Sequence, residues 1–237
     1  MAFEKIFTEN AEKFGVDING DLLGKLKIYA EQLKEWNEKI NLTAITDDEG
    51  MAVKHFIDCL AIFKYVDFKE NSTLLDVGTG AGFPGLVIAA ARPDIKVTLL
   101  DSTGKKLKAV ADIAEKMCLN NVTVLHARAE EAGRQKEYRE SFMYVTARAV
   151  AGLRTLCEYC LPFVQVGGSF ISMKGSQAQE EIDEAQNAVS VLGGQIKKIN
   201  TFELLNSGER NIIEIKKVSQ TPAKYPRASA KISAKPL

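Results

Sequence analysis

The segment from Leu74 to Gly85 has the composition of a loop that holds a ligand. Its sequence, LLDVGTGAGFPG, passes from apolar, β-forming residues into alternating glycines and then into a proline suited to a first helical turn. Glycine accepts positive φ angles and lets a ligand approach the backbone closely. A loop after the first strand of a doubly wound sheet lies at the edge where ligands bind. The sequence therefore predicts a cofactor at this loop.

Two kinds of cofactor fit such a loop, and Asp76 favours one of them. Residues Gly80–Gly85 match GxGxxG, the pattern that holds the pyrophosphate of a dinucleotide. A carboxylate at Asp76 would repel that pyrophosphate but attract the ammonium and sulfonium groups of S-adenosylmethionine. The loop thus favours S-adenosylmethionine over a nicotinamide cofactor. Alternatively, Asp76 caps the amides of the loop, a role that either cofactor permits.

Polar residues also follow the second and third predicted strands. Asp101 lies 23 residues after Gly78, where a carboxylate can accept hydrogen bonds from both hydroxyls of a ribose. Arg128, Ala129 and Glu130 follow the third strand, where backbone groups could contact an adenine edge. A surface ion pair between Arg128 and Glu130 is the alternative, and the spacing does not decide between them. Asp101 supports an adenosine-containing ligand without separating the two cofactors.

The cysteines and histidines do not indicate a metal or redox centre. Cys157 and Cys160 form a CxxC motif, but they fall inside an apolar helical segment rather than at a helix start after a strand. A structural zinc site needs about four Cys or His ligands in paired motifs. The other two cysteines and the two histidines form no second pair. We therefore predict that the CxxC belongs to a packed helix.

The elements that must position these residues follow two patterns. Residues 22–40 carry apolar side chains at spacings of three and four, which is one face of a helix, and a second helical segment covers 48–66. After residue 72, short β-rich runs alternate with helical ones, typical of a parallel sheet covered on both faces. The predicted strands are 73–77, 96–100, 122–126, 142–146, 169–173, 196–204 and 211–216, and the helices between them are 84–92, 104–118, 129–136, 150–163 and 176–191.

The end of the chain departs from this alternation. The last two predicted strands are joined by a turn at 206–208 without a helix, so we expect a hairpin that places an antiparallel strand in the sheet. The following segment holds three prolines and is expected to be extended. Residues 215–237 carry six basic side chains and no acidic one. Such a tail either contacts a polyanion or is simply solvated.

Composition bounds the class of protein. The 237 residues, 46% hydrophobic and 26% charged, are typical of one large folded domain with at most a small appendage, and they exclude wholesale disorder. No apolar run approaches the roughly 20 residues of a membrane span. The start of the chain is charged at once and resembles no signal peptide. We therefore expect a cytoplasmic protein without a membrane partner.

Taken together, the motifs resemble those of the RsmG/GidB family of bacterial small-subunit rRNA methyltransferases. The resemblance covers nearly the whole chain, and its combination of motifs is highly specific. Besides the glycine loop, it rests on WN…NLTAI at 36–45, HFIDCL at 55–60, DS..KK at 101–106, TARAVA at 146–151, MKG at 173–175 and KYPR at 224–227. The chain departs from the family at Met143, where an Asp is usual in the fourth strand, and at Ser229, where a glycine is usual.

The resemblance implies an α/β fold of the class I S-adenosylmethionine-dependent methyltransferase type (Rossmann-like). Its sheet has seven mostly parallel strands with a terminal antiparallel hairpin strand. We expect an N-terminal helical extension at 1–70 that packs on the core, a methyltransferase core at 71–217 and a basic tail at 218–237. The implied reaction is methyl transfer to N7 of a specific guanine in the decoding-region loop of 16S rRNA. The partner is the small ribosomal subunit or an assembly intermediate, and we expect a monomer.

The resemblance also implies roles for individual residues. Gly78, Gly80 and Phe83 would line the cofactor loop, Asp101 would bind the ribose, and Ala129 and Glu130 would flank the adenine. Arg148, at the end of the fourth strand, would face the methyl-transfer site. Its alternative is a salt bridge to an acid of the N-terminal helices. The candidate RNA-binding residues are Lys174, Lys224, Tyr225 as a stacking ring, Arg227, Lys231 and Lys235.

The chemistry of guanine N7 fits this set of residues. N7 carries an in-plane lone pair and no proton, so its attack on a sulfonium methyl needs no general base. Positioning alone can supply up to about 7–11 kcal/mol, and we see no acid–base pair near the glycine loop. The product is cationic, so we assign Arg148 to positioning. The alternatives are a methyltransferase of the same fold with another acceptor, an NAD-dependent oxidoreductase, and a non-catalytic binder of S-adenosylmethionine or RNA.

Overall fold

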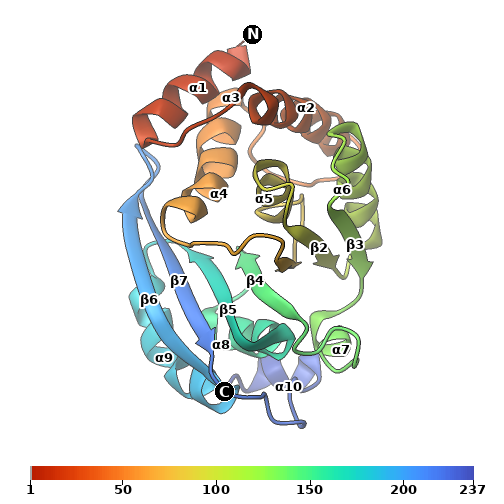
Figure 1. Ribbon diagram of the computed structural model, residues 1–237, viewed down its shortest axis with the longest axis vertical. Coiled ribbons are helices and arrows are strands. Elements are labelled where there is room, and N and C mark those ends of the chain that lie inside the picture. Colours follow the sequence, from red (N-terminus) through yellow and green to blue (C-terminus); the bar gives the residue numbers. More distant parts are fainter. Residues whose placement is uncertain (1) are drawn as a thin grey trace.

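One mixed sheet of seven strands forms the centre of the molecule (Figure 1). The structure is a computed structural model and describes residues 2–237. Its strands are β1 (Thr73–Val77), β2 (Lys96–Asp101), β3 (Val122–His126), β4 (Phe142–Arg148), β5 (Val164–Lys174), β6 (Gly194–Glu203) and β7 (Glu209–Lys217). Their order is β3-β2-β1-β4-β5-β7-β6.

The direction of the strands confirms the predicted sheet. Strands β1 to β5 pair in parallel, whereas β7 is antiparallel to both β5 and β6. From β1 the chain builds outward to β3 and then returns to place β4 on the other side of β1. This reversal of strand order creates a switch point beside the end of β1, the position where open α/β sheets bind ligands.

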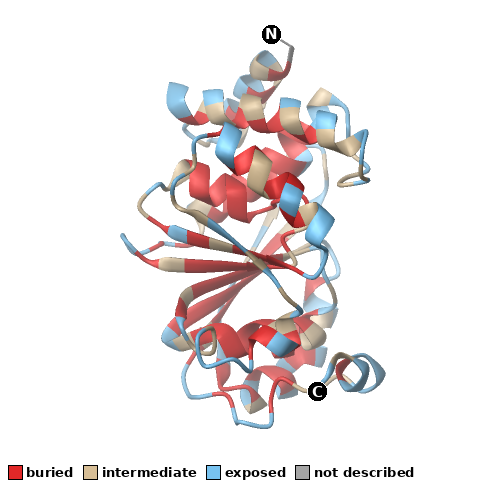
Figure 2. Cartoon of the chain, turned by 90° about the vertical axis from the view of Figure 1, so that its right-hand side faces the viewer, coloured by how far each residue is buried: buried red, intermediate tan, exposed pale blue. Residues whose placement is uncertain are grey.

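Helices cover both faces of the sheet (Figures 1 and 2). They are α1 (Ala2–Phe14), α2 (Gly20–Asn37), α3 (Asp48–Gly50), a π-helix (Met51–Ile57), α4 (Asp58–Leu60), a 3-10 helix (Ala61–Lys64), α5 (Gly85–Ala91), α6 (Gly104–Lys116), α7 (Ala129–Ala132), α8 (Leu153–Cys160), a 3-10 helix (Leu161–Phe163), α9 (Ala178–Val191) and α10 (Ser229–Ala234). Asn19 caps α2 by accepting a hydrogen bond from the Leu22 amide. Where one helix was expected over 48–66, the structure has four short pieces, including a π-helical turn. None of the helices in residues 2–237 is long and apolar enough to cross a membrane.

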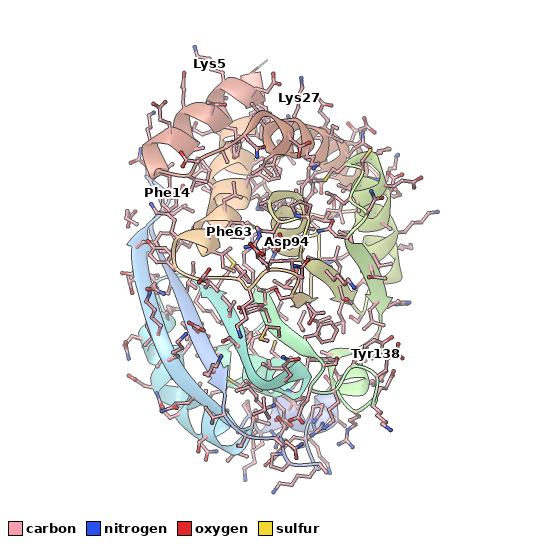
Figure 3. The ribbon with its side chains drawn as sticks, viewed as in Figure 1. Lys5, Phe14, Lys27, Phe63, Asp94 and Tyr138 are labelled. Carbon is pink, nitrogen blue, oxygen red and sulfur yellow. The ribbon has the colours of Figure 1, made fainter. Side chains whose placement is uncertain are left out.

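Two hydrophobic clusters hold the helices on the sheet, one on each face (Figure 2). The first joins α1, α2 and the π-helix to α5 and α6, so the N-terminal helices share their core with the helices that follow β1 and β2. Phe14 at the end of α1, labelled in Figure 3, also packs against Phe202 of β6, with ring centroids 5.7 Å apart. The N-terminal helices thereby reach from one end of the sheet to the other.

The second cluster contains α8, α9 and the start of the C-terminal tail. Cys157 and Cys160 are buried free thiols on α8, which confirms the packed helix, and burial raises the pKa of both. No group of three or more His, Cys, Asp or Glu side chains in residues 2–237 is arranged to hold a metal ion.

The C-terminal tail folds back on the molecule, and the prediction that it is extended is wrong. Residues Ser229–Ala234 form α10. The preceding segment is fastened by arginines of the core, because Arg139 donates to the carbonyls of Thr221 and Tyr225, and Arg134 donates to that of Pro226. The backbone carbonyls of this irregular segment thus have hydrogen-bond donors, which a strand or a helix would otherwise supply.

Candidate active site

A cavity of about 500 Å³ lies at the switch point of the sheet. Its size is within the range of about 300–1,000 Å³ found for small-molecule sites. The cavity is lined by six of the seven predicted cofactor-binding residues, namely Gly78, Gly80, Phe83, Asp101, Ala129 and Glu130, and by Arg148. The carboxyl ends of β1, β2, β3 and β4 thus contribute to one site, as the topology requires.

The glycine loop has a conformation that side chains would disturb. Gly78 and Gly80 have φ angles of 70° and 58°. A Cβ atom on Gly78 would lie 2.7 Å from a methyl carbon of Val150, too close for either to stay in place. The absence of side chains here keeps the backbone of the loop open to the cavity.

Asp101 is held in place by the loop itself. Its Oδ2 accepts from the amide of Gly80 at 3.0 Å, and its Oδ1 accepts from the amide of Thr103 at 2.8 Å. A carboxylate oxygen can accept a second hydrogen bond. Each oxygen of Asp101 therefore keeps acceptor capacity toward the cavity, which suits a pair of ribose hydroxyls.

Asp76 supports the loop from below and does not line the cavity. It is fully buried and accepts hydrogen bonds from Thr79 Oγ1 at 2.7 Å, the amide of Gly85 at 3.0 Å and Thr146 Oγ1 at 3.2 Å. Burial raises the pKa of Asp76 to about 6 in spite of these bonds. The expectation that Asp76 contacts the cofactor is therefore corrected to its alternative, a cap for the loop.

Arg148 extends from the end of β4 into a cluster of charges. Its Nη1 donates to Asp58 Oδ2 at 2.8 Å and to the carbonyl of Lys54 at 3.0 Å. The other oxygen of Asp58 lies 3.3 Å from Nε of Arg210 on β7. Arg148 thus forms the ion pair that was the alternative to a role in the site, since Asp58 belongs to the N-terminal helices, and it also lines the cavity.

His55 and the ring of Phe83 contact Arg148 from the side, and Tyr29 in turn packs on Phe83. Arg148 Nη2 lies 3.3 Å from His55 Nδ1, and its guanidinium carbon is 5.0 Å from the centre of the Phe83 ring. His55 stacks on Phe83 with ring centroids 4.5 Å apart, and Tyr29 stacks on it at 5.0 Å. The Tyr29 hydroxyl donates to the carbonyl of Ala81 in the glycine loop at 2.8 Å. The N-terminal helices thereby support the loop and the arginine together.

His55 is neutral at pH 7 because burial and the charge of Arg148 lower its pKa to about 4. A neutral ring that accepts from Arg148 at Nδ1 carries its proton on Nε2, which lies 2.8 Å from Thr43 Oγ1. Neither nitrogen is therefore available as a general base. The HFIDCL and NLTAI motifs contained these two residues, but sequence spacing could not show that they meet at Arg148.

A second cavity, of about 650 Å³, adjoins the first. The two share His55, Arg148, Ala149 and Val150 in their walls. Lys174 lines only the second cavity, where its Nζ lies 2.7 Å from Glu181 Oε2 and donates to the carbonyl of Ala151 at 2.6 Å.

Known proteins resemble this chain over its full length. A family profile described as rRNA small subunit methyltransferase G matches residues 22–213. The Ribosomal RNA small subunit methyltransferase G of Acetivibrio thermocellus is 48% identical over 238 residues, which cover all of this chain and 98% of that protein. The protein of the same name from Clostridium perfringens is 44% identical over the whole of both chains. The chain belongs to the rRNA small subunit methyltransferase G family.

A solved structure of low sequence identity shares the fold of this chain. The 16S rRNA (adenine(1408)-N(1))-methyltransferase of Catenulisporales acidiphilia, solved with its cosubstrate SAM, has a TM-score of 0.51 and 14% identity, covering 64% of this chain and 87% of that one. With the strand order above, this confirms the class I methyltransferase fold. The RsmG/GidB resemblance in the sequence is also confirmed.

Within the family fold, some of the residues predicted to contact RNA are held by contacts inside the protein. Tyr225 is only 7% exposed, so its ring offers no face to a base, and the prediction of a stacking ring is wrong. Arg227 binds the buried carboxylate of Glu158, with Nη2 2.6 Å from Oε2. Lys174 is 9% exposed and faces the second cavity rather than the surface. Lys224 and Lys231 are exposed, as is Lys235.

The two departures from the family pattern have different structural settings. Met143 lies at the start of β4, packs against the first hydrophobic cluster and lines neither of the two cavities. Ser229 begins α10, lines the first cavity and lies 3.4 Å from the Tyr159 hydroxyl. A side chain at 229 therefore adds to the cavity wall.

Proposed function

We propose that this protein transfers a methyl group from S-adenosylmethionine to N7 of a specific guanine in the decoding-region loop of 16S rRNA. One observation carries the proposal. A cavity with the volume and acceptors for an adenosine adjoins a second cavity at Arg148, in a chain of the small-subunit rRNA methyltransferase family. A donor site and an acceptor site that share a wall are what group transfer requires.

The residues around the first cavity fit S-adenosylmethionine. Asp101 offers acceptors for the two ribose hydroxyls, and Ala129 and Glu130 lie where an adenine would be flanked. The open backbone at Gly78 and Gly80 accommodates the amino-acid portion. When bound, S-adenosylmethionine supplies an activated methyl group on a sulfonium centre.

The residues at the junction suit a reaction without proton transfer. The guanine N7 lone pair forms the bond to the methyl carbon as the carbon–sulfur bond breaks, and the positive charge passes to the guanine ring. His55 is neutral and engaged at both nitrogens, and Arg148 is held by three groups. We therefore assign Arg148 to orienting the reactants, which suits a rate gained from positioning.

The rest of the chain supports rRNA as the partner. We assign residues 1–70 to a helical extension on the methyltransferase core at 71–217, with the basic tail at 218–237; Met1 lies outside the described residues. Lys224, Lys231 and Lys235 are exposed and provide phosphate contacts on the tail. We propose that a monomer binds the small subunit or its assembly intermediate.

Incubation with labelled S-adenosylmethionine and small subunits from a strain lacking this activity tests the proposal. We expect label in 7-methylguanosine at one position of 16S rRNA. Arg148→Ala should lower kcat/KM by about 100-fold or more, the cost of misplaced reactants, while Lys108→Ala on the exposed face of α6 should match wild type. Arg148→Lys keeps a positive charge beside Asp58, and it replaces the alanine variant in this test if that variant unfolds. Label in another nucleoside or in protein would contradict the proposal.

A further inference from the structure

The second cavity is the place where an acceptor base can meet the methyl donor. Its wall includes Arg148 and His55, which also line the cofactor cavity. Reacting atoms must approach to about 3–3.5 Å, so the base has to lie against this shared wall. A volume of about 650 Å³ is well within the range of about 300–1,000 Å³ for small-molecule sites.

The charges of this cavity suit a nucleotide. Four cationic side chains line it, Lys54, Arg148, Lys174 and Arg210, against the two carboxylates of Asp58 and Glu181. The excess of positive charge favours a ligand that carries a phosphate. Apolar side chains of Met173, Phe202 and Ile212 complete the wall and can contact the face of a base.

The two carboxylates differ in whether one of their oxygens can accept a further hydrogen bond from a ligand. Each oxygen of Asp58 is taken by an arginine, Arg148 or Arg210. Glu181 uses only Oε2, which accepts from the amide of Leu153 at 2.6 Å and lies 2.7 Å from Lys174 Nζ. No hydrogen bond from a group in residues 2–237 reaches Oε1 of Glu181, whose side chain is 28% exposed. Glu181 lines the second cavity but not the first.

Guanine presents the groups that such a carboxylate oxygen accepts. Its N1–H and N2–H₂ donors lie on the opposite side of the base from N7, whereas adenine has an acceptor at N1 and no amino group at C2. We propose that the second cavity holds the target guanine, with Glu181 Oε1 accepting from the N1–H and N2–H₂ edge so that N7 faces Arg148 and the cofactor cavity. This inference rests on the proposed function and adds to it a residue that selects guanine over adenine.

The same contact assists the reaction. Attack by N7 leaves a positive charge on the guanine ring, and the carboxylate of Glu181 is hydrogen-bonded to that ring on its far side. Its attraction to the base therefore increases as the methyl group is transferred. The arrangement needs no proton to leave, because N7 carries none.

Glu181→Gln tests the inference, with Glu180→Gln as the matched control on the exposed face of the same helix. The Leu153 amide and Lys174 both need an acceptor, so the glutamine oxygen takes the Oε2 position and its NH₂ group faces the guanine donors. We expect kcat/KM on small subunits to fall by about 10- to 100-fold, as for loss of a charge-assisted hydrogen bond. The Kd for S-adenosylmethionine should stay at the wild-type value, and Glu180→Gln should match wild type throughout. Because Lys174 loses its anionic partner, a small fall in the melting temperature of Glu181→Gln is expected.

Small subunits reconstituted with inosine at the target position give the decisive comparison, because inosine lacks only the N2 amino group. Inosine should lower kcat/KM of the wild type by about 10-fold but change that of Glu181→Gln little, since a contact already lost cannot be lost again. An equal inosine penalty in both proteins, or full activity of Glu181→Gln on guanine, would overturn the inference. If the wild type itself labels no guanine N7, the proposed function fails instead.

Discussion

Replacing His55 with asparagine should remove much of the pH dependence of stability between pH 7 and pH 4. His55 is 8% exposed, and burial together with Arg148 lowers its pKa from the ordinary 6.5 to about 4. The unfolded chain therefore takes up a proton at this residue near pH 6.5, whereas the folded chain resists it until about pH 4. The stability that depends on a neutral His55 is complete above pH 6.5 and is lost as the pH falls through that window.

The size of the effect follows from the two pKa values. A difference from 6.5 to about 4 corresponds to about 3 kcal/mol of unfolding free energy in total, of which about 2 kcal/mol is lost between pH 7 and pH 5. Asp76 contributes with the opposite sign, because its pKa is raised to about 6. It adds about 1 kcal/mol of stability over the same interval. Since both proteins contain Asp76, its contribution cancels when they are compared.

Urea unfolding of wild type and His55→Asn at pH 7, 6 and 5 provides the assay. The asparagine side chain still offers an acceptor to Arg148 but cannot take up a proton. At pH 7 the variant should be less stable by about 1–2 kcal/mol, because it loses the stacking on Phe83 and the bond to Thr43. That deficit should shrink by about 2 kcal/mol at pH 5 and can reverse sign. Free energies that run parallel across the three pH values would refute the reasoning.

Two further predictions concern charges described above. Asp58→Asn removes the carboxylate shared by Arg148 and Arg210. Breaking a buried ion pair costs about 3–5 kcal/mol, which at this chain length is a fall in Tm of roughly 6–20 °C by calorimetry. Exposed Asp183→Asn is the control, and a fall below about 2 °C would contradict the prediction. The double substitution of Lys231 and Lys235 by alanine should reduce the slope of log K for small-subunit binding against log salt by about 1.4–1.8. An unchanged slope would place the RNA elsewhere.

Local sequence signals were sufficient for the parts of the fold that depend on neighbouring residues. The bounds of β1 and β3 agree with the predicted 73–77 and 122–126. Both are short runs of β-forming residues, and a loop follows each of them. Gly78, Gly80 and Asp101 were predicted to line the site because each lies at or just after the end of a strand, and the end of a parallel strand has a defined position at the edge of the sheet.

Features that depend on distant partners were not predictable in the same way. The π-helical turn at Met51–Ile57 is almost entirely buried, so its hydrogen bonding follows the packing around it. The burial of Tyr225 depends on arginines from the region of α7, which hold the tail by its carbonyls. The open oxygen of Glu181 could not be inferred either, since a sequence shows that a residue is charged but not which of its oxygens is occupied.

The position of Asp58 has a consequence for the order in which the site forms during synthesis. The N-terminal helices are made first, but Arg148 and Arg210 follow Asp58 by 90 and 152 residues. At translation rates of about 5–20 residues per second, the second arginine is added about 8 to 30 s after the carboxylate. Until then the Asp58 carboxylate lacks these two counter-charges, and its burial would cost free energy. Docking of the N-terminal helices on the sheet is therefore favoured only late. The two cavities therefore acquire their common wall near the end of synthesis.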